Sequence, residues 1–383
     1  MKMKMVLKKS FVMIGLIGLA FVGVFIMAQS SFQKEVATQP GLALDINLKS
    51  GGNMIIKGWE QNKVTVKAEF SNGDQNNWNI DVKKLSTGIS VKSEFIGKKH
   101  KNNGSITFAF MVPKKYDLKL DSMGGTITIM GVEGNFSGKT MGGDIKGNQL
   151  KGVIEMKTMG GEISLTDSDL DGKVKTMGGR VMLENIMGDV SGSSMGGNVI
   201  YKNVKSRSGN SSGEVVNIST MGGDINVSEA THGAKIQTMG GDIHVISAKE
   251  FIVAKTMGGT ITVEDISGWI KAETMGGDVA VTMTGNPKIG KRDVTLSSMG
   301  GNITLTVPAE LSMSVDITLA YTKNSRQNYK ITSDFDLQQN KTDTWDNSKG
   351  TPRKYIYGKG NINGGTHKIY IKTINGNVTL KKK

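Results

Sequence analysis

Short runs of alternating apolar and polar residues cover most of the chain, and they come in pairs on either side of a Met-Gly-Gly tripeptide. Around Met159, for example, Ile154 and Met156 precede the tripeptide at alternate positions, and Ile163 and Leu165 follow it in the same way. Alternation with a period of two is typical of a β-strand that buries one face. Each copy of the tripeptide therefore predicts two short strands joined by a corner.

The tripeptide recurs with a spacing of 18 residues, apart from one interval of 26 and one of 24. Its copies begin at Met123, Met141, Met159, Met177, Met195, Met221, Met239, Met257, Met275 and Met299. This period is shorter than the ~40 residues of a propeller blade, and it predicts the coil of a solenoid. A hexapeptide helix would need an apolar residue at every sixth position, but polar residues stand ten after the Met at Glu133, Lys151 and Asp169.

The predicted fold is therefore all-β, a flattened single-stranded β-solenoid, parallel β-helix-like, with 18-residue coils and capping coils at both ends. Caps are expected because the open end of a solenoid exposes apolar surface and strand edges. We expect glycine at the corner to supply a positive φ. The predicted segments are a linker at 29–40, N-terminal β coils and cap at 41–122, the regular Met-Gly-Gly solenoid at 123–310, and C-terminal β coils at 311–383 with a loop excursion at 322–361.

The first 28 residues combine four lysines with an uninterrupted apolar run from Phe11 to Ala28. This combination is typical of an export signal, and the small Ala28 before the polar Gln29 marks a cleavage point. The run is also long enough to approach a membrane span, so an uncleaved anchor is the alternative. We expect an exported protein of the periplasm, cell envelope or cell surface, which meets a membrane only through this segment if it is uncleaved.

The formal net charge of +14 favours contact with anionic envelope polymers. Nucleic acid is not an expected partner, because the basic residues are scattered among acids and form no stripe with aromatic residues. The chain has no cysteine, which excludes disulfides, thiolate metal sites and a cysteine nucleophile.

Three columns beside the repeated glycines are candidates for chemistry. The ten Met side chains are the type of ligand that soft copper(I) prefers, but Met also fills irregular space in cores, and we expect that role here. Ser or Thr precedes every Met, and we expect these hydroxyls to bond to one another or to backbone groups of neighbouring coils. An Asp, Glu or Asn usually follows the glycines, where calcium binding and turn capping are the alternatives and turn capping is expected. We expect no cofactor and no metal.

Phe251 and Trp269 occupy the same outward column in consecutive coils, so their rings should lie one above the other. Exposed stacked rings can grip a sugar or a protein, although a covering loop is the simpler explanation. We treat the pair as the candidate ligand contact. Two insertions, at 205–214 and 284–292, are expected to form loops.

No enzyme signature is present. The four histidines, His100, His232, His244 and His367, show no metal-ligand spacing, and there is no phosphate loop or nucleophile elbow. Some solenoid proteins do cleave polysaccharides with carboxylates on an outer face, but here the acids lie in turns. We therefore expect a non-catalytic protein.

Several longer segments resemble the bacterial family named putative adhesin, a domain of unknown function. The segments are GLALDINLKSGGNMIIKGWEQNKVTVKAEF, ITFAFMVPKKYDLKLDSMGGTITI, GNITLTVPAELSMSVDITL and GGTHKIYIKTINGNVTL, within about residues 41–381. The resemblance implies an exported β-solenoid and assigns no ligand or site residue. This chain departs from the family in placing Met so uniformly before the glycines.

The expected function is a non-enzymatic, adhesin-like envelope or surface scaffold that binds a polymer, a glycan or a protein. The alternatives are a carbohydrate-active β-helix enzyme and an accessory protein of envelope stress or signalling. Self-association is a further possibility, because the ends and edges of solenoids can pair with one another.

Overall fold

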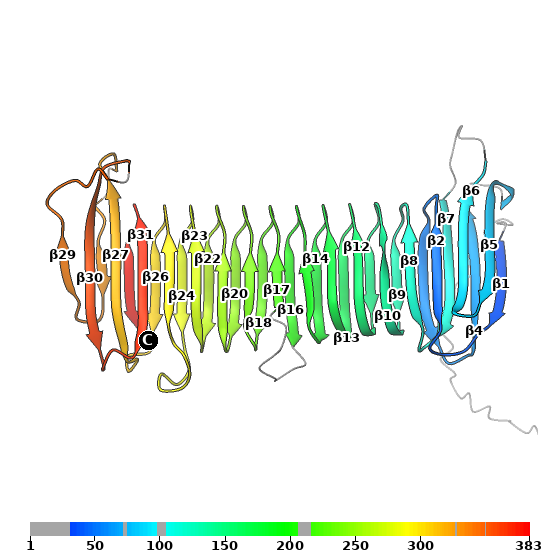
Figure 1. The fold of residues 1–383 in the computed structure, drawn as a ribbon, viewed down its shortest axis with the longest axis horizontal. Coiled ribbons are helices and arrows are strands. Elements are labelled where there is room, and N and C mark those ends of the chain that lie inside the picture. The colour runs from blue at the N-terminus through cyan, green and yellow to red at the C-terminus, as the bar shows by residue number, and fades with distance from the viewer. Residues whose placement is uncertain (1–30, 72–74, 98–104, 206–215, 326–327, 349) are drawn as a thin grey trace, which may run out of the picture.

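The computed structural model describes residues 31–71, 75–97, 105–205, 216–325, 328–348 and 350–383. Within them the protein is an all-β, solenoid-like rod with short strands on two faces (Figure 1). The predicted signal sequence and its predicted cleavage point at Ala28 and Gln29 lie outside the described residues, as do His100 and most of the insertion at 205–214. No helix within the described residues is long and apolar enough to cross a membrane.

The strands that precede each Met-Gly-Gly corner form one face of the rod, called the first face. From the N-terminal side these strands are β8 (Asp117–Ser122), β10 (Glu133–Thr140), β12 (Lys151–Thr158), the second half of β13 (Ile163–Thr176), β15 (Val190–Ser193), β17 (Val216–Ser219), β19 (Ala234–Gln237), β21 (Phe251–Lys255), β23 (Trp269–Thr274) and β25 (Val294–Ser298).

The strands that follow each corner form the opposite, second face. These strands are β9 (Ile127–Met130), β11 (Ile145–Asn148), the first half of β13, β14 (Val181–Met187), β16 (Val199–Lys205), β18 (Ile225–Ala230), β20 (Ile243–Ala248), β22 (Ile261–Ile266), β24 (Val279–Met283) and β26 (Ile303–Val307).

Neighbouring strands on each face are parallel and in register. On the first face Thr140 pairs with Thr158 and Thr158 with Thr176, while on the second face Ile145 pairs with Ile163. Equivalent residues therefore lie in columns along the rod. The apolar columns predicted from the alternation point inward, as shown by Ile163 and Val181, which are fully buried between the two faces.

The corner opposite Met-Gly-Gly is the one that uses left-handed backbone. Gln149, Asp167, Asn185 and Asn203 have φ between 49° and 54°. Asn and Asp tolerate this conformation better than other residues with a Cβ. At the Met-Gly-Gly corner only Gly125 among the second glycines has a φ in this region, at 91°. The expectation that glycine supplies a positive φ at this corner is therefore wrong for the other nine copies.

At the N-terminal end the two faces continue and then change pairing direction. β2 (Ala43–Leu48) and β3 (Asn53–Trp59) extend the faces in parallel, followed by β6 (Gly88–Phe95) and β7 (Ser105–Pro113). Antiparallel strands then close both faces, namely β5 (Trp78–Leu85) on β6, β4 (Lys63–Ser71) on β7, and β1 (Ser31–Ala37) on β4, with the short 3-10 helix η1 (Gln75–Asn77) before β5.

The segment 29–40 is consequently not the expected linker, because most of it is the strand β1. Val36 of β1 faces Val64 of β4, which is fully buried. The polar composition of the segment suggested a linker, but β1 is an edge strand, and its other residues are largely exposed. Such a strand is stabilised by backbone pairing more than by burial of its side chains.

At the C-terminal end the chain order and the spatial order differ. After β26 the chain forms β27 (Met313–Thr322), β28 (Ile331–Ser333), β29 (Gln338–Lys341) and β30 (Arg353–Ile362), and it returns as β31 (His367–Ile374) and β32 (Val378–Lys382). β31 pairs with both β25 and β27, and β32 pairs with both β26 and β28. The last coil in sequence is therefore inside the stack, and residues 313–362 cover it.

The expected loop excursion at 322–361 is correspondingly wrong. This segment contributes β28, β29 and β30, and β30 is antiparallel to β27 along its whole length. Many of its polar residues lie on the outer surface of a cap that has solvent on one side. The composition of such a cap resembles that of a loop, which explains the incorrect expectation.

Candidate functional site

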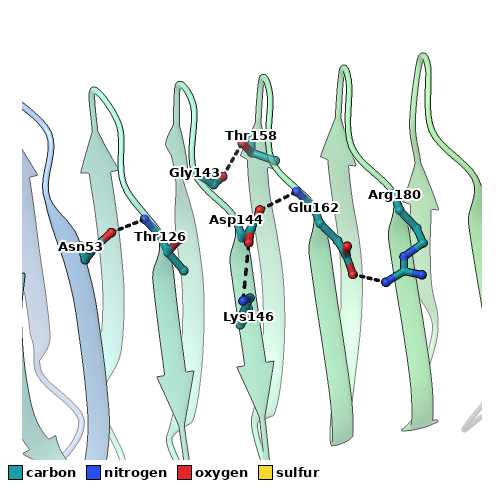
Figure 2. Close-up of polar contacts among 8 residues, drawn as sticks. All are labelled: Asn53, Thr126, Gly143, Asp144, Lys146, Thr158, Glu162 and Arg180. Atoms are coloured by element: carbon teal, nitrogen blue, oxygen red, sulfur yellow. Dashed lines mark hydrogen bonds and ion pairs between the residues drawn. The ribbon is translucent and has the colours of Figure 1, made fainter.

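The hydroxyl before each Met joins two consecutive corners. Thr158 Oγ1 donates to the carbonyl of Gly143 in the preceding coil at 2.8 Å (Figure 2). It also accepts the backbone N–H of Gly161 in its own corner at 3.2 Å. Thr176 repeats both contacts with Gly161 and Gly179. The prediction that these hydroxyls satisfy backbone groups of neighbouring coils is confirmed, and their contacts are those of a structural column.

The second glycine of each corner lies against the corner before it. A Cβ on Gly179 would lie 2.1 Å from the carbonyl oxygen of Gly161, whereas a Cβ on Gly178 would have no neighbour closer than 3.4 Å. The same contrast holds for Gly160 and Gly161. The second glycine is required by this close approach of stacked backbones, and the first glycine is not.

The Met side chains do not fill the corner. All ten are exposed, with relative accessibilities between 36% for Met195 and 61% for Met123. The expected packing role is therefore wrong. The space inside the corner is occupied by the Thr or Ser side chain and by the second glycine, so the Met points outward. We call the ten residues, from Met123 to Met299, the methionine ridge.

The acidic and amide residues after the glycines form a second structural column. Asp144 accepts the backbone N–H of Glu162 at 2.9 Å, and Asn53 accepts that of Thr126 (Figure 2). Asp224 and Asp242 each accept the N–H of the residue that follows them in the column, at 2.9 and 2.7 Å. These side chains cap the next coil and not their own turn. Among the described residues, no group of three His, Asp or Glu is placed to hold a metal ion.

Exposed ion pairs surround this column. Asp144 contacts Lys146 at 3.5 Å, and Glu162 contacts Arg180 at 2.8 Å (Figure 2). The two partners in each pair are at least one third exposed. Pairs of this kind contribute at most about 1 kcal/mol to stability.

Phe251 and Trp269 stack as their shared column predicts, with ring centroids 5.2 Å apart and an interplanar angle of 15°. Lys291, from the inserted loop between β24 and β25, places its ammonium 5.1 Å from the centre of the Trp269 ring. Gly233 lies against Phe251, where an added Cβ would be 2.4 Å from a ring carbon. Both rings are half-buried between these neighbours. Their role as a ligand contact stays a prediction.

The inserted loop at 284–292 folds around one arginine that the sequence analysis did not single out. Arg292 is 2% exposed, and its guanidinium donates to the carbonyls of Ile289 at 3.1 Å, Asn286 at 2.7 Å and Thr284. Burial lowers the pKa of this guanidinium from its usual value. The hydrogen bonds of Arg292 therefore fix the conformation of the loop, and this explains how the loop can hold Lys291 over Trp269.

The described histidines make separate contacts. His232 Nδ1 lies 3.0 Å from Glu250, and His244 Nε2 lies 2.6 Å from Glu264, both on the surface. His367 begins β31, in the C-terminal coil. The structure does not bring these three side chains into one site.

Tyr201 is a buried residue with a polar group that the sequence analysis did not single out. Its hydroxyl donates to the carbonyl of Val190 at 2.9 Å and accepts the N–H of Gly192. A Cβ on Gly192 would lie 3.1 Å from this hydroxyl, so the two residues fit each other across the interior. Burial raises the pKa of Tyr201 well above its usual value.

A column of lysines on the first face is the feature that the sequence analysis undervalued. Lys139 pairs in register with Lys157, and Lys157 with Lys175. All three are exposed, and none forms an ion pair with another described residue. In the sequence the basic residues are scattered among acids, and these three like charges in adjacent strands were not singled out there.

A groove of about 450 Å³ adjoins this lysine column. It is lined by outward side chains of β12, β13, β15 and β17, which include Glu155, Lys157, Lys173, Lys175, Ser191, Ser193 and Ser219. The groove arises where long lysines on two strands give way to short serines on the next two. Three lysines face a single glutamate in it, and Glu155 is paired with Lys173 at 3.0 Å.

No family model and no curated protein matches this chain. Among solved structures it is similar to a putative cell adhesion protein from Clostridium sporogenes, with 10% identity over 92% of this chain and 100% of that chain and a TM-score of 0.19. It is also similar to a putative adhesin from Parabacteroides distasonis, with 14% identity over 72% and 97% of the two chains and a TM-score of 0.26. A putative adhesin from Parabacteroides merdae gives 13% identity, coverages of 73% and 89%, and a TM-score of 0.21. The two Parabacteroides structures bear the name of the family that the sequence resembles.

Proposed function

We propose that the protein is an exported, non-enzymatic surface or envelope scaffold that binds an anionic polysaccharide along the first face of the rod. In this proposal the chain is a single-stranded β-solenoid with 18-residue coils, capped at both ends, and residues 1–28 direct its export. The observation that carries the proposal is the column of Lys139, Lys157 and Lys175 beside the groove.

The column supports binding of a polymer because its charges repeat along the rod. Because the parallel strands are in register, the Cα atoms of neighbouring lysines in the column lie ~4.8 Å apart. Like charges at this spacing repel one another, and an anionic chain that runs along the rod relieves the repulsion at several points simultaneously. A small ligand would use only part of the column.

The serine hydroxyls that line the groove favour a polysaccharide over a compact anion as the ligand. Ser191, Ser193 and Ser219 present hydroxyls on consecutive strands beyond the lysines. Hydroxyl groups can donate to and accept from the hydroxyls of a sugar. A polymer with carboxylates and hydroxyls would thus contact both halves of the surface, with the carboxylates on the lysines and the sugar hydroxyls on the serines.

The proposal is tested by binding of polygalacturonate and of neutral dextran to the full chain, measured by calorimetry at low and high salt. The test variant is K139Q/K157Q/K175Q. Its control is K249Q/K288Q/K330Q, which removes the same charge from exposed positions outside the column. We expect the parent and the control to bind polygalacturonate. The test variant should lose at least about tenfold in affinity, because three ammonium groups that would contact the carboxylates of the polymer are removed together.

Three outcomes would overturn the proposal. Equal binding by the two triple variants would mean that net charge alone attracts the polymer. If the parent bound neutral dextran as tightly as polygalacturonate, charge would not be what drives binding. Shortened oligosaccharides in the reaction mixture would mean that the protein is a carbohydrate-active enzyme.

A W269A variant in the same assay tests whether the Phe251 and Trp269 stack contributes to the contact.

A further inference from the structure

The methionine ridge lies on the surface, and its side chains pack only in part against the fold. Its side chains are between 36% and 61% exposed, whereas Met54, Met156, Met283 and Met313 are at most 2% exposed and do pack in the interior. Each ridge side chain keeps more than a third of its surface in water, so it contributes less to stability than a buried Met does.

All ten copies of the repeat nevertheless keep Met at the ridge, as they keep the first glycine beside it, whereas other exposed columns vary. Two positions before the Met, the coils differ, with Lys139, Ser193 and Glu273 among the residues. Three positions after it they hold residues as different as Asp144 and Arg180. All ten copies keep Met although the residues two positions before and three positions after it differ in size and charge. A requirement for the thioether itself accounts for this contrast.

The backbone holds the ridge in a continuous line. Met239 N donates to the carbonyl of Met221, and Met257 N donates to that of Met239, both at 3.2 Å. Met221 N reaches the carbonyl of Met195 at the same distance, although 26 residues separate these two in sequence. The longer interval between Met195 and Met221 therefore does not interrupt the ridge. The Cα atoms of neighbouring ridge residues are therefore ~4.8 Å apart.

This spacing suits metal ions held between neighbouring sulfurs. A bond from a first-row metal to sulfur is about 2.3 Å long, so one ion between two sulfurs spans about 4.6 Å. Thioethers are neutral and soft, and they favour copper(I) and related ions over zinc, calcium or magnesium. Asp224, Asp242 and Asp278 lie at the same edge, three residues after ridge methionines, and their carboxylates offset the charge of bound cations.

We propose that the methionine ridge is a linear binding site for soft monovalent cations, copper(I) or silver(I), with each ion held by thioethers of adjacent coils. The site is independent of the lysine column, which lies on the first face and not on the corner. Neutral thioethers do not titrate, so binding should be nearly independent of pH, in contrast to a site built from His or Cys.

Silver(I) is the probe for the test because it needs no reductant. The full chain is titrated with silver nitrate in chloride-free buffer, and the bound metal is counted by mass spectrometry after desalting. We expect about three to five ions per chain if each is held by two or three sulfurs, and sulfur neighbours in the silver X-ray absorption spectrum.

The test variant is M239L/M257L/M275L, which keeps the size and apolar character of the ridge. Its control is M130L/M182L/M187L, which removes three exposed or half-exposed methionines of the second face outside the ridge. The test variant should lose at least one silver ion per chain, and the control should bind like the parent. A second variant with all ten ridge residues changed to Leu should bind no silver above background.

The proposal is overturned if the parent binds no silver, or if the ridge variants bind as much as the control. Unchanged far-UV circular dichroism shows whether the ten-residue variant has folded, and if it has not, the triple variant decides alone. Polygalacturonate binding by M239L/M257L/M275L should equal that of the parent, which separates this proposal from the one above.

Discussion

The regular array and the two ends of the rod use the same alternation of apolar and polar residues, but different contacts hold them. In the array each corner depends on the one before it, through the hydroxyl of Thr176 and the close approach of Gly179 to Gly161. At the ends, antiparallel strands such as β4 with β7 and β30 with β27 replace the corners. Stacking of identical coils is thus sensitive to small changes at the corner, whereas the ends tolerate irregular sequence.

The largest effect should follow from an added methyl group at the second glycine of a corner. In G179A the Cβ would lie 2.1 Å from the carbonyl oxygen of Gly161, so the two coils would have to separate. We expect a loss of at least about 3 kcal/mol in the free energy of unfolding. Chemical denaturation measures the change.

The adjacent first glycine is the matched control. In G178A the nearest neighbour would be 3.4 Å away, and the free energy of unfolding should stay within about 1 kcal/mol of that of the parent. Similar losses in G178A and G179A would mean that the close approach of the corners is not what requires glycine.

Removal of the corner hydroxyl should have the next largest effect. Val in place of Thr176 leaves the carbonyl of Gly161 and the N–H of Gly179 without this partner, in a fully buried position. A loss of about 2 kcal/mol is expected in denaturant unfolding.

The same substitution at Thr373 sharpens the comparison between array and ends. Thr373 belongs to the C-terminal segment, but its hydroxyl donates to the carbonyl of Gly301 at 2.7 Å, as an array residue does. T373V should therefore be destabilised as much as T176V. A much smaller loss in T373V would show that the last coil is not held like the array.

Tyr201 provides a test that depends on pH. Y201F removes the hydrogen bonds to Val190 and Gly192 and should cost about 1 to 2 kcal/mol at neutral pH. Burial raises the pKa of Tyr201, so the unfolded state loses this proton first as the pH rises. Its contribution is complete below the ordinary tyrosine pKa of 10.0 and falls above it.

The parent should consequently lose stability above about pH 10 more steeply than Y201F does. Denaturant midpoints of both proteins between neutral and strongly alkaline pH measure this difference. Parallel curves for the two proteins would contradict the assigned burial of the hydroxyl.

The smallest effect is expected in the exposed column that caps the next coil. D242A removes the acceptor of the Thr260 N–H and should cost about 1 kcal/mol. D242N keeps an oxygen at this position, as Asn198 and Asn302 do naturally, and should differ little from the parent. An equal loss in both variants would indicate that the charge matters more than the hydrogen bond.

The sequence by itself determined the strands and the direction in which their side chains face. A period of two over a few residues is a local property, so the inward columns of Ile163 and Val181 and the hydroxyl column of Thr158 follow from it directly. The stacking of Phe251 on Trp269 follows from the same register.

Only the tertiary structure decided the features that depend on the distance between coils. A Cβ on Gly179 would lie 2.1 Å from the carbonyl oxygen of Gly161, which excludes a side chain at this position. Met177, in the same corner, is exposed and not buried. The return of β31 between β25 and β27, and the pairing of the edge strands β1 with β4 and β29 with β30, arise because an open end of the rod must be covered by whatever chain can reach it. Such long-range contacts leave no periodic trace in the sequence.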